Sequence, residues 1–338
     1  MKILIVKLSA FGDIIHALPA LHDLMQQPGV DEIHWLLDSR FAFAAALFPE
    51  SVKVHKVALK GDAPLRDAWN MIKTLRKEQF DLILDLQGLI KSGIMARAIG
   101  SNVFGFDARQ SPEKPNRLFV QSVPFHQDDT HVVQLYRRIA AAPFVETAER
   151  ANAMAYTPPV VEVTDSMRKQ GGEALSDNGI NGAFSILHVG ASFATKRIPD
   201  SHWQSVASNL SKDGKVLVLW GNREEQLRAE MTCSVSVNVI TTKQMLSIGT
   251  VAGLLERADA YIGQDTGVTH LAAAVGCPTV CLWGPTAPWR MGALGAEHRH
   301  VVAQVPCGPC FKRACDQFVC MPSIRSEHII AAWREVKR

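Results

Sequence analysis

Short apolar runs alternate with longer amphipathic segments along the first half of the chain. The runs at 2–8 (KILIVKL) and 81–86 (DLILDL) are mostly apolar, which is typical of strands buried on both faces of a parallel sheet. Between such runs, apolar residues recur every three or four positions, which indicates helices. The predicted strands are 2–8, 33–37, 53–58, 81–86 and 102–106, and the predicted helices are 14–27, 65–78, 89–99 and 131–142.

The second half of the chain repeats this alternation. Strand-like runs occupy 184–190, 215–221, 238–242, 260–265 and 278–284, with helical patterns between them. Strands that alternate with helices of this length form parallel β-α-β units. We therefore expect an α/β protein of two Rossmann-like, doubly wound domains, covering 1–155 and 163–324.

Three further segments complete the predicted organisation. Residues 151–162 (ANAMAYTPPVVE) contain two prolines and little periodicity, which indicates the linker between the domains. Residues 325–338 carry a last helical pattern, which we expect to pack back on the first domain. Residues 107–127 are polar and contain prolines, and a loop of this length is often functional.

Composition and charge narrow the class of protein. Hydrophobic residues make up 47% of the chain and charged residues 20%, which describes a globular protein. The net charge of +3 gives no reason to expect nucleic acid as a partner. No run reaches about 18 apolar residues, so no membrane span is predicted. The first apolar run is too short for a signal peptide, and a cytoplasmic protein is the default expectation.

The turn after the first predicted strand places a carboxylate directly behind a glycine. Gly12 and Asp13 follow KILIVKL, and apolar residues at helical spacing begin at Ile14. Ligands of doubly wound sheets bind outside the carboxyl ends of the strands, so we expect a ligand cleft between the two domains and chemistry in these loops. From the residues alone, Asp13 is interpreted as a helix cap.

The segment GQDTGVTH, residues 263–270, has the pattern of an anion site. A predicted strand ends at Asp265, and a helix begins after Thr266 and Gly267. The free N–H groups at a helix start bind phosphate readily, and a glycine lets the phosphate approach the backbone. An ordinary capped helix explains the same spacing equally well.

Two other loops follow strands of the same domain. In HVGASFATKR, residues 188–197, small residues and Lys196 suit a pyrophosphate. In LWGNREEQ, residues 219–226, Glu224 or Glu225 would accept hydrogen bonds from a ribose, although solvated carboxylates are the more common explanation. No Walker A motif and no G-x-G-x-x-G after a strand occurs, which disfavours a nicotinamide enzyme. Together, the three loops favour a nucleotide diphosphate. No D-x-D motif occurs, so neither a metal nor a cofactor is expected.

Four cysteines cluster near the end of the chain. Cys307, Cys310, Cys315 and Cys320 have the spacing C-x2-C-x4-C-x4-C. Four thiolates suit a structural metal, but this spacing differs from the usual pair of C-x2-C knuckles. A structural metal, disulfides and free thiols all remain open.

Four segments are specific in combination. They are IVKLSAFGDIIHALPAL, DLILDLQGLIKS, the TKR-x-P-x-x-x-W loop and DTGVTHLAAAVGCPTVCLWGPT. With them the chain resembles the lipopolysaccharide heptosyltransferases over most of its length. The resemblance implies the GT-B fold of two Rossmann-like domains. It also implies inverting transfer of heptose from an ADP-activated donor to the lipopolysaccharide inner core, without an essential metal.

The resemblance also implies roles for individual residues. Asp13 would be the general base, and Gly12 would give the acceptor room. The diphosphate would meet Ser192, Lys196 and the backbone of Thr266 and Gly267. The remaining donor contacts would be Asp265 and His270 at the heptose or its loop, Glu225 at the ribose and Leu246 at adenine. Lys7, Ser9 and Gly12 are acceptor-binding candidates. From the residues themselves, Arg66, Lys91, Arg109 and Arg117 are further candidates for acceptor phosphates, although ordinary surface charges explain them as well.

The subtype is less defined by these segments. IVK-x-S-x-x-GD and DLQGLIKS look like heptosyltransferase I, which acts on the Kdo sugar of Kdo-lipid A, whereas CGPC-FKR-x-C looks more like types II or III. We expect type I, with ADP-heptose and Kdo-lipid A as partners and peripheral contact with the cytoplasmic face of the inner membrane. A nucleotide-sugar epimerase or hydrolase and a non-catalytic sugar-nucleotide binder remain alternatives, and the oligomeric state is open.

Overall fold

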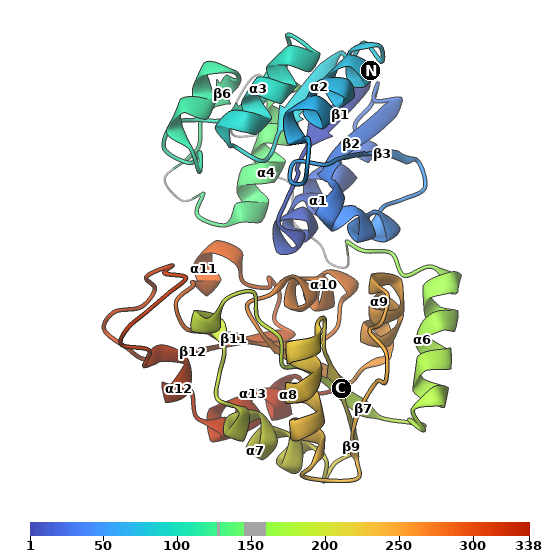
Figure 1. Cartoon of the computed structure of the whole chain (residues 1–338), viewed down its shortest axis with the longest axis vertical. Coiled ribbons are helices and arrows are strands. Elements are labelled where there is room, and N and C mark those ends of the chain that lie inside the picture. The colour runs from blue at the N-terminus through green and yellow to red at the C-terminus, as the bar shows by residue number, and fades with distance from the viewer. Residues whose placement is uncertain (127–128, 145–159) are drawn as a thin grey trace. The chain divides into compact units, whose positions relative to one another are not determined.

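The computed structural model describes residues 1–126, 129–144 and 160–338. The chain divides into two compact units, Met1–Val160 and Val161–Arg338 (Figure 1). Most of the predicted linker at 151–162 lies outside the described residues.

The first unit is built on a parallel sheet with the strand order β3-β2-β1-β4-β5-β6. The strands are β1 (Lys2–Val6), β2 (Glu32–Asp38), β3 (Val52–Val57), β4 (Leu82–Asp85), β5 (Val103–Phe106) and β6 (Gln121–Val123). All five strands predicted from the apolar runs are present. Their side chains are largely buried because helices cover both faces of the sheet.

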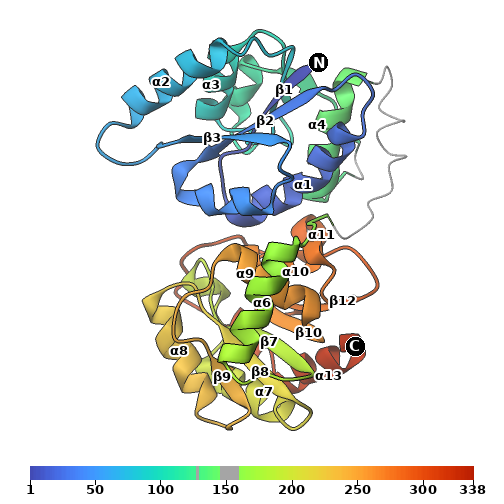
Figure 2. The ribbon, with the colours of Figure 1, turned by 90° about the vertical axis from the view of Figure 1, so that its right-hand side faces the viewer.

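Helices cover the two faces of this sheet in pairs (Figure 2). The helices are α1 (Phe11–Met25), α2 (Pro64–Arg76), α3 (Ile90–Ile99) and α4 (Val132–Ala141), with 3-10 turns η1 (Ser39–Leu47), η2 (Lys114–Leu118) and η3 (Ala142–Phe144). Helices α2 and α3 pack together on one face, and α1 packs with α4 on the other. Ile72 and Met95 join the strand side chains in the core beneath α2 and α3.

The prediction of one long loop at 107–127 is wrong. This segment contains η2 and the edge strand β6. Two side chains anchor it: Val123 is buried, and Asn116 is fully buried and donates to the Asp85 carboxylate at 2.7 Å. A strand of three residues with only one buried side chain is too short to show an apolar run, so its sequence carried no strand pattern.

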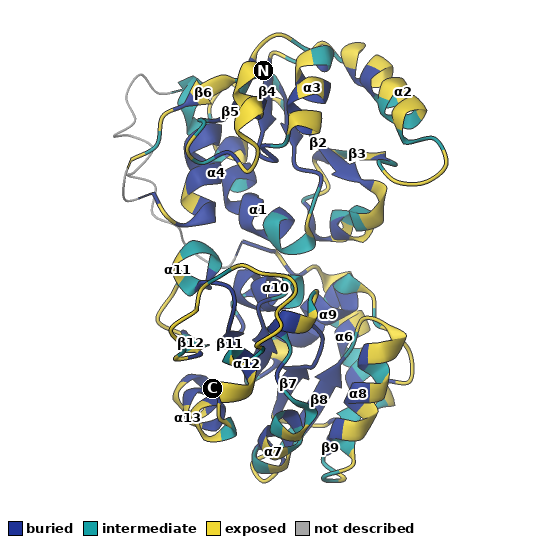
Figure 3. Cartoon of the chain, turned by 60° about the vertical axis from the view of Figure 1, so that its left-hand side comes forward, coloured by how far each residue is buried: buried dark blue, intermediate teal, exposed yellow. Residues whose placement is uncertain are grey.

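The second unit has an equivalent parallel sheet with the order β12-β11-β10-β7-β8-β9. The strands are β7 (Phe184–His188), β8 (Lys215–Leu219), β9 (Val239–Thr241), β10 (Ala260–Gln264), β11 (Thr279–Trp283) and β12 (His298–Val302). Strand β7 is buried along its whole length (Figure 3). The edge strand β12 was not predicted because its sequence, HRHVV, is mostly polar.

The helices of the second unit also form two layers. They are α6 (Asp165–Asp177), α7 (Asp200–Leu210), α8 (Arg223–Cys233), α9 (Ile248–Arg257), α10 (Gly267–Val275), α11 (Pro288–Met291), α12 (Cys320–Ser323) and α13 (Ser326–Val336), with the 3-10 turn η4 (Ala194–Lys196). Helix α9 packs against α6 and α10, whereas α7 packs against α8 and α13. None of the described helices is long and apolar enough to cross a membrane.

The last helix belongs to the core of the second unit. Ile329 and Trp333 of α13 are buried there, and the Trp333 indole N–H donates to Ser185 Oγ at 3.0 Å. We expected this helix to pack back on the first domain, and the structure instead gives it these partners in the second. The apolar stripe of α13 was evident in the sequence, but the stripe alone does not identify the surface that it covers.

In both parallel sheets the order in which strands are added reverses at an equivalent point, the switch point. The chain builds outward from β1 on one side and from β4 on the other, and likewise from β7 and β10. Ligands in such sheets bind outside the carboxyl ends of the strands that flank this switch point. The residues directly after β1, β4, β7 and β10 are therefore the first place to look for a site.

Candidate active site

A buried lysine marks the switch point of the first sheet. Lys7 follows β1 and is 2% exposed. Its ammonium donates to the Leu86 carbonyl at 3.1 Å and to the Tyr136 hydroxyl at 2.8 Å. Burial lowers the pKa of Lys7, while the carboxylates of Asp13 and Asp85 act in the opposite direction. Lys7 thus holds together the residues at the carboxyl ends of β1 and β4, and acceptor contact by Lys7 stays a prediction.

Asp85, at the end of β4, organises the loop that follows it. Its carboxylate accepts from the N–H groups of Gln87 at 3.0 Å and Gly88 at 3.1 Å. It also accepts from the Ser92 hydroxyl at 3.0 Å, beside the Asn116 amide described above. Burial raises the pKa of Asp85, and these four donors oppose that shift. A loop held this firmly presents the Gln87 side chain in one position.

Gln87 connects this loop to the turn that carries Asp13. Its Oε1 accepts from the N–H groups of Leu8 at 2.9 Å and Ser9 at 3.0 Å. The loop after β4 therefore fixes the backbone just before α1. Neither Asp85 nor Gln87 was predicted as a site residue, although both stand in the DLQGLIKS segment that carried the family resemblance.

Asp13 is the third residue of α1 and is half-buried. Its Oδ2 accepts from the N–H of Ala10, the N-cap residue, at 3.1 Å. This oxygen therefore caps the start of α1, as the sequence predicted. Its Oδ1 makes no hydrogen bond to the residues that the structure describes. Ser9 and Gly12, beside it, are half-buried as well. One carboxylate oxygen therefore holds the turn while the other remains available to accept a proton.

Two of the predicted acceptor cations share a pocket. Arg109 and Arg117 line a pocket of about 590 Å³ together with Lys114. Arg66 does not line this pocket. It lies on α2 with a side chain that is 74% exposed. The structure therefore brings together two of the three arginines that the sequence singled out.

Asp265 is the centre of a buried ionic network at the switch point of the second sheet. Its Oδ2 accepts from the Lys196 ammonium at 2.6 Å, which also donates to the Asp265 carbonyl at 3.0 Å. Its Oδ1 lies 3.0 Å from His270 Nε2. Burial alone would raise the pKa of Asp265, but His270 and Lys196 hold it well below its ordinary value. Both carboxylate oxygens are engaged, which favours a role in fixing the loop.

The start of α10 presents unpaired backbone donors. Thr266 is the N-cap, yet its hydroxyl lies 3.3 Å from His188 Nδ1 and 3.2 Å from Thr269 Oγ1 and caps no N–H. The N–H groups of Gly267 and Val268 have no hydrogen-bond partner among the described residues. Burial lowers the pKa of His188, while the Glu225 carboxylate acts in the opposite direction. These features suit the binding of an anion at the helix start.

Glu225 lies against the first glycine of the loop after β7. Its Oε2 accepts from the Gly221 N–H at 2.7 Å, and a Cβ at Gly190 would come within 2.6 Å of its carboxylate. Glu225 is 7% exposed, and its Oε1 makes no hydrogen bond to a described residue. The structure therefore places one free carboxylate oxygen next to the predicted pyrophosphate loop, as a ribose contact requires.

Two residues that sequence reasoning missed hold this loop in place. Gln264 accepts from the Ile198 N–H at 3.0 Å and donates to the carbonyls of Val189 and Gly190 at 3.3 and 3.1 Å. Arg228 donates to the carbonyls of Val189 and Ile198, each at 3.1 Å. Gln264 stands directly before Asp265 at a strand end, and this position could have marked it as a site residue. Arg228 lies in the middle of α8, where nothing in the sequence indicates a contact with the loop.

The two weaker donor predictions lie on loops. Ser192 is exposed in the loop after β7, and Leu246 is half-buried between β9 and α9. Their contacts with phosphate and adenine stay predictions.

The cysteine segment lies against the donor loop. The Thr195 hydroxyl donates to the Lys312 carbonyl at 2.9 Å, and the Arg313 guanidinium lies 4.7 Å from the centre of the Phe193 ring. Cys307, Cys310, Cys315 and Cys320 are free thiols. Within the described part of the chain, the metal-compatible cluster is a different one, formed by Glu32, His34 and Glu78. Arg313 is thus a further cation near the donor loop that the sequence analysis did not identify.

Two doubly wound units with loops of this kind at their switch points define the GT-B class of glycosyltransferase fold. The solved structure of Escherichia coli heptosyltransferase WaaC with ADP-2-deoxy-2-fluoro heptose matches 99% of this chain and 99% of that chain, with a TM-score of 0.77 at 22% identity. The model of glycosyltransferase family 9 (heptosyltransferase) matches residues 68–318, and the chain belongs to this family.

Curated relatives differ in how much of the chain they match. Lipopolysaccharide heptosyltransferase 1 of Pseudomonas aeruginosa is 32% identical over 329 residues, which is 93% of this chain and 87% of the relative. Lipooligosaccharide heptosyltransferase 2 of Campylobacter jejuni is 28% identical over 156 residues, which is 43% of this chain and 48% of the relative. The similarity to the type 1 enzyme therefore extends through both units.

Proposed function

We propose that this chain is a heptosyltransferase of type I. It would transfer heptose from ADP-heptose to the Kdo sugar of Kdo-lipid A, with inversion at the anomeric carbon. The observation that carries this proposal is the similarity to a heptosyltransferase 1 across 93% of the chain, against 43% for a heptosyltransferase 2. The buried network around Asp265 and the free donors of α10 support the ADP-sugar part of the proposal.

The donor site uses the groups already in place in the second unit. The N–H groups of Gly267 and Val268 bind the diphosphate, and Lys196 adds a positive charge to the same turn. Glu225 accepts from the ribose, Ser192 approaches the diphosphate, and Leu246 lies along adenine. Fixed donors and a buried cation of this kind stabilise the departing ADP as negative charge develops on it.

The chemistry of transfer belongs to Asp13. Its free oxygen takes the proton from the acceptor hydroxyl while that oxygen attacks the anomeric carbon of heptose. The bond from this carbon to the diphosphate oxygen breaks in the same step, and ADP leaves with the electron pair. The rate gain depends mainly on the position of this oxygen, which Gln87 fixes through the turn that precedes Asp13.

The acceptor is bound on the first unit. The pocket of Arg109, Lys114 and Arg117 suits the phosphates and carboxylates of an anionic lipid-linked sugar. Ser9 and Gly12 line the approach to Asp13. Arg66, in the first turn of α2, is a further cation for the acceptor. Because such an acceptor is anchored in a bilayer, the protein works in peripheral contact with the cytoplasmic face of the inner membrane.

The test is incubation of the purified protein with ADP-heptose and Kdo-lipid A, followed by mass spectrometry of the lipid. We expect a gain of one heptose that disappears in Asp13→Ala. A gain only on an already heptosylated acceptor would replace type I by type II or III. Tight ADP binding with no gain on any acceptor would favour a non-catalytic binder. In that case Asp13→Ala would also leave ADP binding unchanged.

A further inference from the structure

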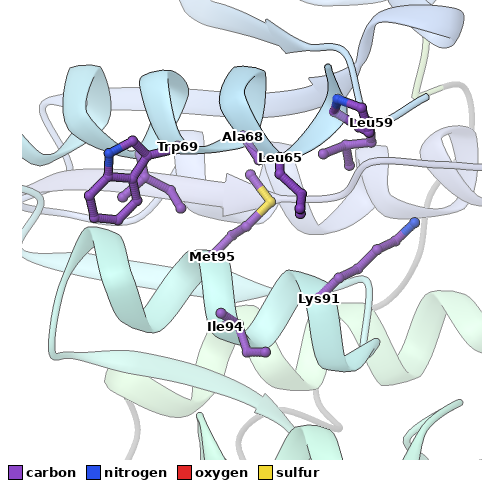
Figure 4. A pocket seen from close by; sticks show the side chains of 9 residues that line it. Leu59, Leu65, Ala68, Trp69, Lys91, Ile94 and Met95 are labelled. Atoms are coloured by element: carbon purple, nitrogen blue, oxygen red, sulfur yellow. The ribbon is translucent and has the colours of Figure 1, made fainter. Parts of the chain in front are cut away.

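Helices α2 and α3 enclose an apolar groove on the outer surface of the first unit (Figure 4). The groove has a volume of about 420 Å³. Trp69 and Leu65 reach into it from α2, and Met95 and Lys91 face them from α3. The donor and acceptor contacts described above use none of its apolar side chains. Of the acceptor candidates, Lys91 lines the groove and Arg66 lies next to Leu65 on α2.

The groove gathers an unusual share of exposed apolar side chains. Leu65 is 86% exposed, Trp69 52% and Ile94 47%, and all three line the groove. Eight large hydrophobic side chains are exposed in the described part of the first unit, and these are three of them. Figure 3 shows the outward sides of α2 and α3 as exposed. Contiguous exposed apolar surface of this kind marks an interaction site.

Basic side chains are concentrated on the segments that form the groove, and we call them its basic rim. Residues 60–77 contain five basic and two acidic side chains, a local charge of +3, and Lys91 raises it to +4, whereas the whole chain carries +3. The Lys73 ammonium lies 5.4 Å from the centre of the Trp69 ring, so charge and apolar surface are in contact. The six basic side chains are all exposed, namely Lys60, Arg66, Lys73, Arg76, Lys77 and Lys91.

One end of the groove lies at the catalytic edge of the sheet. Lys91 is the second residue of α3, which begins directly after the β4 loop that holds the Asp13 turn through Gln87. Leu59 and Leu65 likewise follow the carboxyl end of β3. The carboxyl ends of parallel strands share one edge of a sheet, so the groove opens on the same edge as Asp13.

We propose that this groove and its basic rim form a docking face for the surface of an anionic phospholipid bilayer. Exposed Leu and Trp side chains enter the interface between headgroups and acyl chains, while lysines and arginines contact the anionic headgroups. A second copy of the chain is a poor occupant, because a two-fold interface would bring these six cations against themselves. The inference rests on the proposed function only in giving docking a purpose, namely access to a lipid-anchored acceptor.

The test is flotation of the full-length protein with vesicles of phosphatidylglycerol and phosphatidylcholine, compared with phosphatidylcholine alone. We expect the wild type to bind the anionic vesicles and to be released by high salt. The double variant Leu65→Ser/Trp69→Ser removes two inserted side chains and should lower the bound-to-free ratio at least about tenfold. Lys73→Gln should lower it about fivefold.

A matched control separates this face from general surface hydrophobicity. Val237 is 91% exposed and Trp289 is 53% exposed, both in the second unit, so Val237→Ser/Trp289→Ser removes comparable side chains elsewhere. This control should bind vesicles like the wild type. Melting followed by circular dichroism should show both double variants folded, because the replaced side chains are exposed.

Three results would overturn the proposal. These are absence of wild-type binding to anionic vesicles, equal binding by Leu65→Ser/Trp69→Ser, and a change of sedimentation mass in that variant, which would identify the groove as a self-association surface. Transfer to a de-acylated, water-soluble acceptor keeps the two proposals apart. If the groove serves docking, Leu65→Ser/Trp69→Ser should turn over this soluble acceptor as fast as the wild type. If the wild type itself shows no turnover, the enzymatic proposal is wrong, and the vesicle result still tests the docking proposal.

Discussion

Each of the two sheets places a buried lysine and a buried aspartate at its switch point, but the two pairs are used differently. In the second unit, Lys196 and Asp265 contact each other at 2.6 Å, and His270 completes the network. In the first unit, Lys7 donates to neutral oxygens, and Asp85 accepts from four neutral donors. The same two residue types therefore make an ionic network in one unit and a scaffold for a neighbouring carboxylate in the other.

The comparison indicates how the two ligands are recognised. The donor side is largely assembled before ligand arrives, with fixed loops, free backbone N–H groups and a buried cation. On the acceptor side, the supporting residues are buried but the predicted contacts, Arg109 and Arg117, are exposed. We infer that donor affinity is set by internal structure, whereas acceptor affinity is set by charge on the surface.

Asp13 should give the largest effect on turnover. Asp13→Asn keeps an oxygen that can accept from the Ala10 N–H but removes the proton acceptor, so kcat should fall about 100- to 10,000-fold. Steady-state release of ADP measures this. Circular dichroism should show an unchanged melting temperature. Turnover within a few-fold of the wild type would remove Asp13 from the mechanism.

The same substitution at the two buried lysines sharpens the comparison. Lys196→Met leaves the buried, ionised Asp265 with only His270, so the free energy of unfolding should fall by about 3–5 kcal/mol. Lys7→Met removes a donor to two neutral oxygens, the Leu86 carbonyl and the Tyr136 hydroxyl, and should cost about 1–3 kcal/mol. Urea unfolding of both variants measures the difference. Equal losses would show that the direct ion pair has no special role in the second unit.

The two bracing glutamines offer a second matched pair. Gln264→Leu removes the partner of the Ile198 N–H, and Gln87→Leu removes the partner of two N–H groups before Asp13. Each should cost about 1–3 kcal/mol of stability because buried donors lose their acceptor. Gln264→Leu should then raise the KM for ADP-heptose, whereas Gln87→Leu should lower kcat. Both variants changing the same kinetic parameter would break the proposed division of labour.

Lowering the pH should have the smallest effect, a modest loss of thermal stability. Burial lowers the pKa of His188, so as pH falls the unfolded chain takes up a proton at this residue before the folded protein does. Its contribution to stability is therefore full above about pH 6.5 and is lost as pH falls below that value. His188→Gln should flatten the decline in melting temperature between pH 7.5 and 5.5. Burial also lowers the pKa of His55 on β3, but this residue is only half-buried, so His55→Gln should flatten the decline less. The reverse order would contradict this account.

The sequence predicted the central strands well because they are apolar runs. It missed β6, which has only three residues, and β12, whose sequence is mostly polar, because edge strands need few buried side chains. The candidate site is a different case. Position after a strand predicted an anion site at Lys196 and at the turn of Thr266, whereas Asp13 was interpreted as a helix cap and received a catalytic role only from the family resemblance. These roles stay predictions. Arg228 acts from the middle of a helix, and its role depends on which carbonyls the fold brings to it. No spacing in the sequence records that placement.

In the proposed mechanism, donor binding and proton removal belong to different units. Calorimetric titration of ADP into two variants tests it most directly. Asp13→Asn should bind ADP with a Kd within about twofold of the wild type, whereas Glu225→Gln, which removes the carboxylate beside Gly190, should bind about tenfold more weakly. Loss of ADP binding in Asp13→Asn, or unchanged binding in Glu225→Gln, would contradict the claim.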